Sequence, residues 1–222
     1  MKKTVTIIDY GVGNLLSVTR AFEHCGATVK LAHDAYDIER ASHLILPGVG
    51  AFADGMQGLR DRDLVEPIRR YAASGRPLMG ICLGMQMLAT ASEEFGEHEG
   101  LNLIPGRVRA IPRVAVDGSA LKTPHIGWSP LYKQAQVDWT DTILADTVLE
   151  SSVYLVHSFA VELDDSADLL SHCVYGGHRI SAVIRRNSVV GCQFHPEKSG
   201  PVGLKIIAGF LTQDELDRAS VT

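Results

Sequence analysis

The chain has 222 residues, which is enough for one domain, or at most two small ones, with a large buried core. Its composition is 45% hydrophobic and 21% charged with a formal net charge of −5, which argues against a disordered, nucleic-acid-binding or membrane protein. No stretch approaches the ~18 apolar residues of a membrane span, and Asp9 interrupts the apolar start that a signal peptide would need.

The first predicted element is a short β-branched strand over residues 4–9, of the kind that is buried on both faces. A glycine-rich turn and a helix follow it, as they do in dinucleotide-binding proteins. The dinucleotide fingerprint G-x-G-x-x-G needs a third glycine where this chain has Leu16, so that pattern is incomplete. Residues 27–32 and 43–46 are predicted to be the second and third strands.

The third predicted strand opens into the loop Pro47-Gly48-Val49-Gly50. A glycine loop after a strand suits backbone N–H groups that point at an anion, although a simple turn has the same composition. Residues 64–73 form an amphipathic helix with Pro67 in its first turn, where proline is tolerated. The alternation of strands and helices up to residue 92 therefore predicts a doubly wound, mostly parallel α/β sheet with helices on both faces.

Residues 77–86 contain a candidate nucleophile at a sharp strand-to-helix junction. Gly80 and Gly84 flank Cys82 at minus two and plus two, which is the spacing of a nucleophile elbow. The helical pattern after the turn continues from Met85 to Ala91. A thiol at a helix N-terminus is favoured as a thiolate, the nucleophilic form. The alternative is that Cys82 is a small buried hydrophobe, as free cysteines often are.

The second half of the chain begins with an irregular section over residues 97–149, which we expect to be antiparallel strands and loops inserted in the α/β framework. Beyond it, Pro201 opens a C-terminal helix over 203–211, and residues 214–222 are expected to fray. The strands predicted in this half are 107–111, 114–116, 131–132, 153–159, 170–175, 182–184 and 189–194.

The last predicted strand leads into a candidate base. Pro196 ends the strand just after His195, and Glu197 follows two residues after the histidine. Glu197 can bind one imidazole nitrogen while the other faces the thiol, so the chain supplies a nucleophile, a base and an orienting carboxylate. The other cysteines, Cys25, Cys173 and Cys192, form no C-x-x-C pair with each other or with Cys82, so we expect no metal site and reduced thiols in a cytoplasmic protein.

Two segments, Gly80-Ile81-Cys82-Leu83-Gly84-Met85-Gln86 and Gln193-Phe194-His195-Pro196-Glu197, resemble the two signatures of class I (triad-type) glutamine amidotransferases. The resemblance implies a single glutaminase domain over residues 1–222, in which Cys82 attacks the side-chain amide of glutamine and the His195–Glu197 pair activates it. It also implies an oxyanion hole with N–H donors at Gly50 and Leu83, beside a strand formed by Val49 and Gly50. Glutamine would contact Gln86, Gly50, Ser158 and Phe159.

The segments Asp9-Tyr10-Gly11-Val12-Gly13-Asn14 and Pro47-Gly48-Val49-Gly50 resemble one branch of this family, the glutaminase subunit of imidazole glycerol phosphate synthase. The resemblance implies a separate cyclase subunit, a (β/α)₈ barrel that uses the ammonia to form imidazole glycerol phosphate and the aminoimidazole carboxamide ribotide in histidine biosynthesis. The two subunits would form a heterodimer without cofactor, metal, nucleic acid or membrane. The expected partner-interface residues are Asn14, Tyr154, His157 and Lys198.

Two departures from the family pattern and several other functions stay open at this stage. Ser129 stands where the family usually has Asn, and Phe159 where it usually has Tyr. A main-chain contact at position 159 would survive the second change, whereas a hydroxyl contact would not. The alternatives are a glutaminase subunit for another biosynthetic pathway, another cysteine hydrolase on the same fold, and a non-catalytic binding module.

Overall fold

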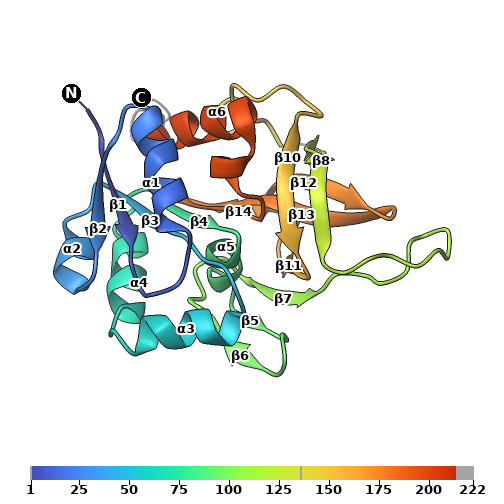
Figure 1. Cartoon of the computed structure of the whole chain (residues 1–222), viewed down its shortest axis with the longest axis horizontal. Helices are drawn as coiled ribbons and strands as arrows, with labels where there is room; N and C mark the ends of the chain where they lie inside the picture. Colours follow the sequence, from blue (N-terminus) through green and yellow to red (C-terminus); the bar gives the residue numbers. More distant parts are fainter. Residues whose placement is uncertain (1, 136, 214–222) are drawn as a thin grey trace.

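The structure is a computed structural model that describes residues 2–135 and 137–213 (Figure 1). The segment 214–222, expected to fray, lies outside the described residues. The centre of the fold is an eight-stranded sheet with the strand order β2-β1-β3-β4-β14-β13-β12-β9. Its strands are β1 (Thr4–Ile8), β2 (Thr28–Ala32), β3 (His43–Leu46), β4 (Leu78–Ile81), β9 (Tyr132–Lys133), β12 (Leu169–Tyr175), β13 (His178–Arg186) and β14 (Val189–Cys192).

The first five strands in this order are parallel, and helices cover both of their faces (Figure 1). Side chains alternate across a strand, so β1 sends Val5 and Ile7 to one core and Ile8 to the other. The first core packs against α1 (Leu15–His24) and α6 (Gly200–Leu211). The second packs against α2 (Ala35–Glu39), α3 (Phe52–Arg60), α4 (Val65–Ala73) and α5 (Leu83–Met87). The doubly wound α/β fold expected from the sequence is therefore confirmed.

The antiparallel part of the molecule lies beyond β14. Strands β13, β12 and β9 extend the central sheet in antiparallel fashion. Two smaller sheets lie beside it, a pair of β8 (His125–Pro130) with β10 (Ser152–His157), and a sheet with the order β11-β7-β5-β6. The strands of this last sheet are β5 (Ala91–Ser92), β6 (His98–Glu99), β7 (Gly106–Ala110) and β11 (Phe159–Leu163).

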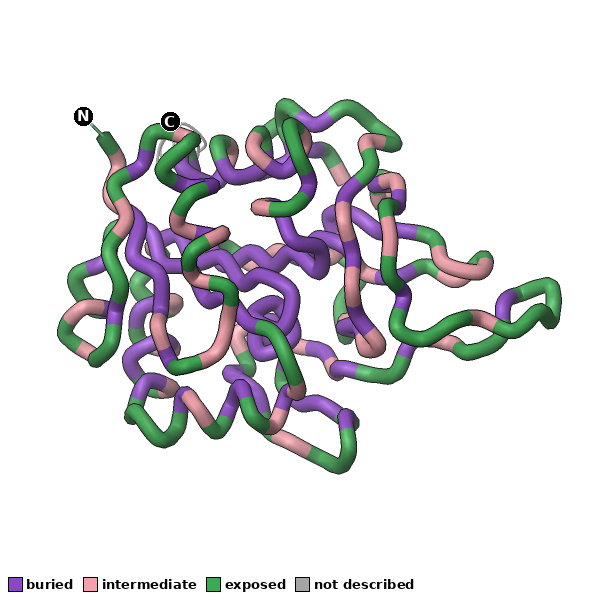
Figure 2. Tube along the Cα trace, in the orientation of Figure 1, coloured by how far each residue is buried: buried purple, intermediate pink, exposed green. Residues whose placement is uncertain are grey.

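Three local predictions are wrong. The helix after Cys82 ends at Met87, and Ala91 belongs to strand β5. The strand predicted over 153–159 is two strands, β10 and β11, which separate at Ser158 and join different sheets. The segment 114–116 forms only an isolated bridge, between Val114 and Ala120, in a loop that projects from the body (Figures 1 and 2). Within the described residues, no helix is both long enough and apolar enough to cross a membrane.

The junction between β4 and α5 depends on two close backbone approaches. A Cβ atom on Gly84 would lie 1.8 Å from the Leu46 carbonyl oxygen of β3. A Cβ atom on Gly80 would lie 2.7 Å from the backbone of Gly84. Both distances are far below van der Waals contact, and the neighbouring atoms are backbone, which cannot move aside as a flexible side chain can. The two glycines therefore allow the helix to start directly above the sheet.

We expect Gly84→Ala to lower the free energy of unfolding by about 3 kcal/mol, because the added methyl group forces α5 away from β3. Urea unfolding followed by circular dichroism measures this change. The matched control is Gly118→Ala, where the Cβ atom meets open space and only the positive φ of 86° is strained. That strain is worth about 1 kcal/mol. Equal losses in the two variants would contradict the close-approach explanation.

Candidate active site

Cys82 occupies a strained position between β4 and α5. Its backbone has φ 55° and ψ −110°, a conformation that L-residues rarely adopt. The Cys82 N–H donates to the Cys192 carbonyl of β14 at 2.7 Å, which fixes the turn to the neighbouring strand. Cys82 is the N-cap of α5, and the residue is 7% exposed. The sharp strand-to-helix turn predicted from the glycine spacing is thus present in the structure.

His195 follows the neighbouring parallel strand, β14, so its ring meets the elbow at the carboxyl edge of the sheet. Its Nδ1 lies 2.8 Å from Oε1 of Glu197, and the ring also hydrogen bonds to the Cys82 side chain. Burial lowers the pKa of His195, but its hydrogen bonds to Cys82 and Glu197 and its electrostatic interactions with them outweigh this effect. Together these effects raise the pKa of His195 to about 9. At neutral pH the ring is therefore a proton donor beside the sulfur.

His195, the candidate base, is held by strand β10 as well as by Glu197. The His195 N–H donates to the Tyr154 carbonyl at 3.1 Å, and the Tyr154 N–H donates to Oγ of Ser199 at 3.0 Å. Oγ of Ser199 in turn donates to the His195 carbonyl at 2.7 Å. The Glu197 side chain is 1% exposed, and its Oε2 has no hydrogen-bond partner in the part of the chain that the structure describes. Within the described residues, the Glu197 carboxylate therefore makes its hydrogen bond through Oε1, to Nδ1 of His195.

A cavity of about 290 Å³ opens above Cys82 and His195. It brings together the predicted nucleophile, base, oxyanion and glutamine-contact residues, although they come from widely separated segments. It also contains three residues that the sequence analysis missed, Glu94, Pro124 and Val156. Its predicted members are Val49, Gly50, Cys82, Leu83, Gln86, His157, Ser158, Phe159 and His195.

Gln86 lies one helical turn after Cys82 and is buried. Its Nε2 donates to the Phe159 carbonyl at 2.9 Å and to Oε1 of Gln193 at 3.1 Å. Gln193 is fully buried, and its own amide lies 3.9 Å from the Cys82 sulfur. Gln86 therefore fixes the main chain of Phe159 at the cavity wall. The polar side chain of Gln193 in the otherwise apolar run 189–194 is the signal that could have identified it.

The segment 47–51 is a loop, whereas the family resemblance implies a strand formed by Val49 and Gly50. The Tyr10 hydroxyl donates to the Pro47 carbonyl at 2.7 Å at one end of this loop. At the other end, Oε2 of Glu94 accepts from the Phe52 N–H at 2.7 Å. Gly50, with a φ of +100°, lies between these two anchors. Glu94 is hidden in the sequence among Glu93, Glu97 and Glu99, and only its burial distinguishes it.

His157 is not a surface residue, contrary to the expected role in a partner interface. It is 5% exposed, and its ring nitrogens contact the Phe159 carbonyl at 2.9 Å and Nδ1 of His125 at 3.2 Å. Burial is the main cause that lowers the pKa of His157 to about 4, so the ring is neutral at physiological pH. Oγ of Ser129 lies 3.1 Å from Nε2 of His125 and completes this internal chain of contacts.

The other expected interface residues lie nearer the surface. Asn14 is exposed and caps α1 through a 3.3 Å contact with the Ser17 N–H, and Lys198 is exposed directly after Glu197. Tyr154 is half-buried and packs edge-on against Trp128, with ring centroids 6.0 Å apart. Trp128, which is 58% exposed, was missed in the sequence analysis.

In residues 2–135 and 137–213, no group of three or more His, Cys, Asp or Glu side chains is arranged to hold a metal ion. All four cysteines are free. The side chains present in the cavity include a thiol, an imidazole, an amide and a carboxylate, with backbone N–H groups at the start of α5. This set suits nucleophilic acyl transfer through a thioester.

Two solved structures have a fold similar to that of this chain although their sequence identity to it is low. PurLQS from Thermotoga maritima has a TM-score of 0.70 and 19% identity, covering 97% of this chain and 100% of that chain. A glutamine amidotransferase, also from Thermotoga maritima, has a TM-score of 0.61 and 17% identity, covering 100% of this chain and 87% of that chain. At these identities the likeness shows the common fold.

Sequence comparison places the chain in a family. The family model for class-I glutamine amidotransferases matches residues 6–213. Imidazole glycerol phosphate synthase subunit HisH 1 of Legionella pneumophila (strain Paris) is 53% identical over 94% of this chain and 98% of its own. The HisH subunit of Syntrophotalea carbinolica is 44% identical over 93% of this chain and 98% of its own. The family-model match and the 53% identity together show that the chain belongs to the class-I glutamine amidotransferases, among the HisH subunits of imidazole glycerol phosphate synthase.

Proposed function

We propose that this chain hydrolyses glutamine to glutamate and ammonia, and that residues 1–222 act as one glutaminase domain. The observation that carries the proposal is the arrangement of Cys82, His195 and Glu197 at the carboxyl ends of two paired parallel strands, with Cys82 and His195 at the floor of one cavity. In such an arrangement the thiol is the nucleophile, the imidazole is the base that activates it, and the carboxylate orients the imidazole.

In the proposed mechanism, the Cys82 sulfur attacks the side-chain amide carbon of glutamine. His195 gives a proton to the departing nitrogen, ammonia leaves, and a thioester to Cys82 remains. His195 then takes a proton from water, which attacks the thioester and releases glutamate. N–H groups of Leu83 and Gly50 would stabilise the oxyanion, and one such donor is typically worth about 10²–10³ in rate. Gln86, Ser158 and Phe159 would hold the glutamine, with Glu94 on the same wall.

The ammonia is used by a separate cyclase subunit in histidine biosynthesis, since the relatives at 53% and 44% identity are named as subunits of imidazole glycerol phosphate synthase. We propose that this partner is a (β/α)₈ barrel and that it docks on the exposed face of the β8–β10 pair. Ile126, Trp128, Tyr154 and Val156 lie on that face, and Val156 also lines the cavity. Asn14 and Lys198 would complete the interface, and a cytoplasmic location suits the four free thiols.

The alternatives have less support. A glutaminase for another pathway would draw on the likeness to PurLQS, but that structure shares only 19% identity with this chain and therefore informs on its fold alone. Another cysteine hydrolase or a non-catalytic module would not explain the match of residues 6–213 to the amidotransferase family model together with an intact triad.

Cys82→Ser should abolish glutamine-dependent turnover of the complex with its cyclase while turnover supplied by ammonium salts is kept. The reason is that the nucleophile serves only ammonia production. Cyclase product formation with either nitrogen source measures both activities. The matched control is Cys25→Ser, a half-buried thiol outside the cavity, which should keep both. Measurable glutaminase activity in Cys82→Ala, which keeps no nucleophile at this position, would contradict the covalent mechanism.

Glu197→Gln should reduce kcat less than His195→Ala, because Glu197 orients the ring and makes no bond to substrate. We expect losses of about 10² and about 10⁴ respectively. Glu197→Gln also removes a negative charge that raises the pKa of His195 to about 9. We therefore expect the basic limb of the pH–rate profile to move from near pH 9 to lower pH. Equal losses in kcat, or an unmoved basic limb, would refute this division of roles.

Trp128→Ala should weaken binding of the cyclase by about 30-fold or more, the size expected when a central aromatic anchor is truncated. Isothermal titration calorimetry with the purified cyclase measures the dissociation constant. Tyr36→Ala is the control, because Tyr36 is an exposed aromatic on α2, at the other edge of the sheet (Figure 1). If both variants bound like the wild type, the proposed docking face would be wrong.

A further inference from the structure

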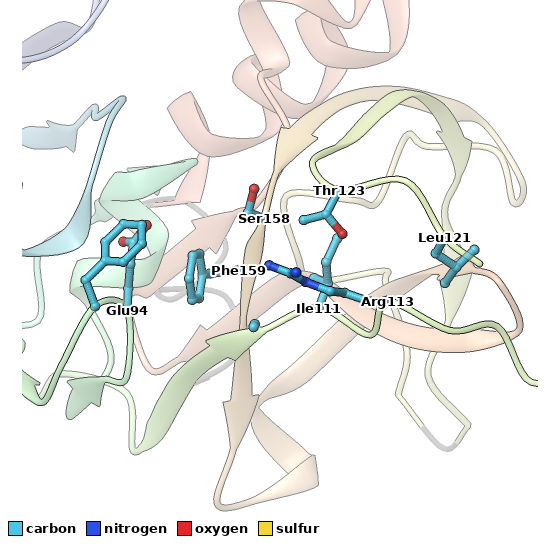
Figure 3. Close-up of a pocket in the computed structure, with 9 residues that line it drawn as sticks. Glu94, Ile111, Arg113, Leu121, Thr123, Ser158 and Phe159 are labelled. Atoms are coloured by element: carbon cyan, nitrogen blue, oxygen red, sulfur yellow. The ribbon is translucent and has the colours of Figure 1, made fainter.

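A second cavity, of about 420 Å³, adjoins the active-site cavity and shares Glu94, Ser158 and Phe159 with it (Figure 3). Its other walls come from Phe95 between β5 and β6, from the end of β7 and from the loop between β7 and β8. Glutamine that presents its amide carbon to Cys82 would have its α-carbon a side chain's length away, which allows an extended substrate to run along the shared wall. The charged α-amino and α-carboxylate groups can then reach the outer cavity.

The outer cavity carries one cationic side chain among its described lining residues, Arg113. Figure 3 shows its guanidinium pointing toward Phe159, on the side of the cavity where Glu94 lies. Glu94 and Arg113 thus bring opposite charges to the same cavity. A zwitterionic amino acid head group has the complementary pair of charges, with a carboxylate that suits the planar guanidinium fork.

Arg113 is not committed to another role in the fold. It is exposed and has no ion-pair partner within the described segments 2–135 and 137–213. By contrast, Arg107 and Arg109 on the adjoining strand β7 are both paired. Their carboxylate partners are Glu93, Glu97 and Glu162.

The main chain that carries Arg113 is fixed, even though the loop projects from the body. The Arg113 carbonyl accepts from the Leu121 N–H at 2.8 Å, and the Ala115 N–H donates to the Ser119 carbonyl at 2.8 Å. Asp117 closes the turn by accepting from the Ser119 N–H at 2.9 Å. The Cα atom of Arg113 therefore has a defined position beside the cavity, and only the side chain has to be ordered on binding.

We propose that Arg113 is a substrate-recognition residue that binds the α-carboxylate of glutamine in the outer cavity while the side-chain amide enters the inner one. This inference rests on the proposed glutaminase function and adds to it the residue that selects for a free α-carboxylate. Because Arg113 is exposed, water and salt screen its charge, so the expected contribution is about tenfold in kcat/KM rather than thousandfold.

The test uses the complex with its cyclase and two substrates, glutamine and 4-aminobutanamide, which is glutamine without the α-carboxylate. Arg113→Gln should lower kcat/KM for glutamine about tenfold, mainly through KM, and leave kcat/KM for 4-aminobutanamide unchanged. Arg113→Lys, which keeps the charge but not the fork, should recover part of the loss. The wild-type kcat/KM for glutamine should fall with added salt more steeply than that of Arg113→Gln.

The control is Arg179→Gln, which removes the same charge from an exposed position on β13 outside both cavities and should behave as the wild type. Equal losses on the two substrates would show that Arg113 acts only on structure, and unchanged glutamine kinetics would show that it does not act on the substrate. Either result would overturn the inference while the glutaminase function stands. A wild-type complex that releases no ammonia from glutamine would overturn both.

Discussion

The active site depends on the pairing of β4 with β14. These strands are parallel neighbours in the register Ile81 opposite Cys192, and the Cys82 N–H continues the pairing by one more hydrogen bond. Residues that directly follow adjacent parallel strands emerge at the same edge of a sheet. Cys82 and His195, the proposed nucleophile and base, are far apart in the chain, but backbone hydrogen bonds make them neighbours before any side-chain interaction acts.

A second constraint acts on the loops around this pair. Tyr10 joins the first loop to Pro47, Glu94 joins the start of α3 to the strand β5 region, and Gln86 fixes the carbonyl of Phe159. Each contact is a buried polar group bonded to backbone, and breaking one would leave an unsatisfied donor or acceptor away from water. Helix, loop and inserted sheet are consequently fixed around one cavity, although each belongs to a different part of the fold.

Elements that depend on a local sequence pattern could be predicted from the sequence. Features that depend on contacts between residues far apart in the chain could not. The β-branched run of β1 and the Gly80–Gly84 spacing around Cys82 identified a strand and an elbow from the sequence. The end of α5 was misplaced because all of its residues are buried, so no exposed face marks where the helix stops. The role of Glu94 was hidden because its partner, the Phe52 N–H, is 42 positions away and is a backbone group with no sequence signature.

The backbone at position 82 suits glycine better than cysteine. Holding a side chain at a φ of 55° and ψ of −110° costs about 1–3 kcal/mol. Glycine would avoid that strain, although its greater freedom in the unfolded chain offsets about 1 kcal/mol of the gain. A library of variants sorted for heat resistance alone would therefore favour loss of the sulfur, and a thermostable version of this protein has to be screened for turnover at the same time.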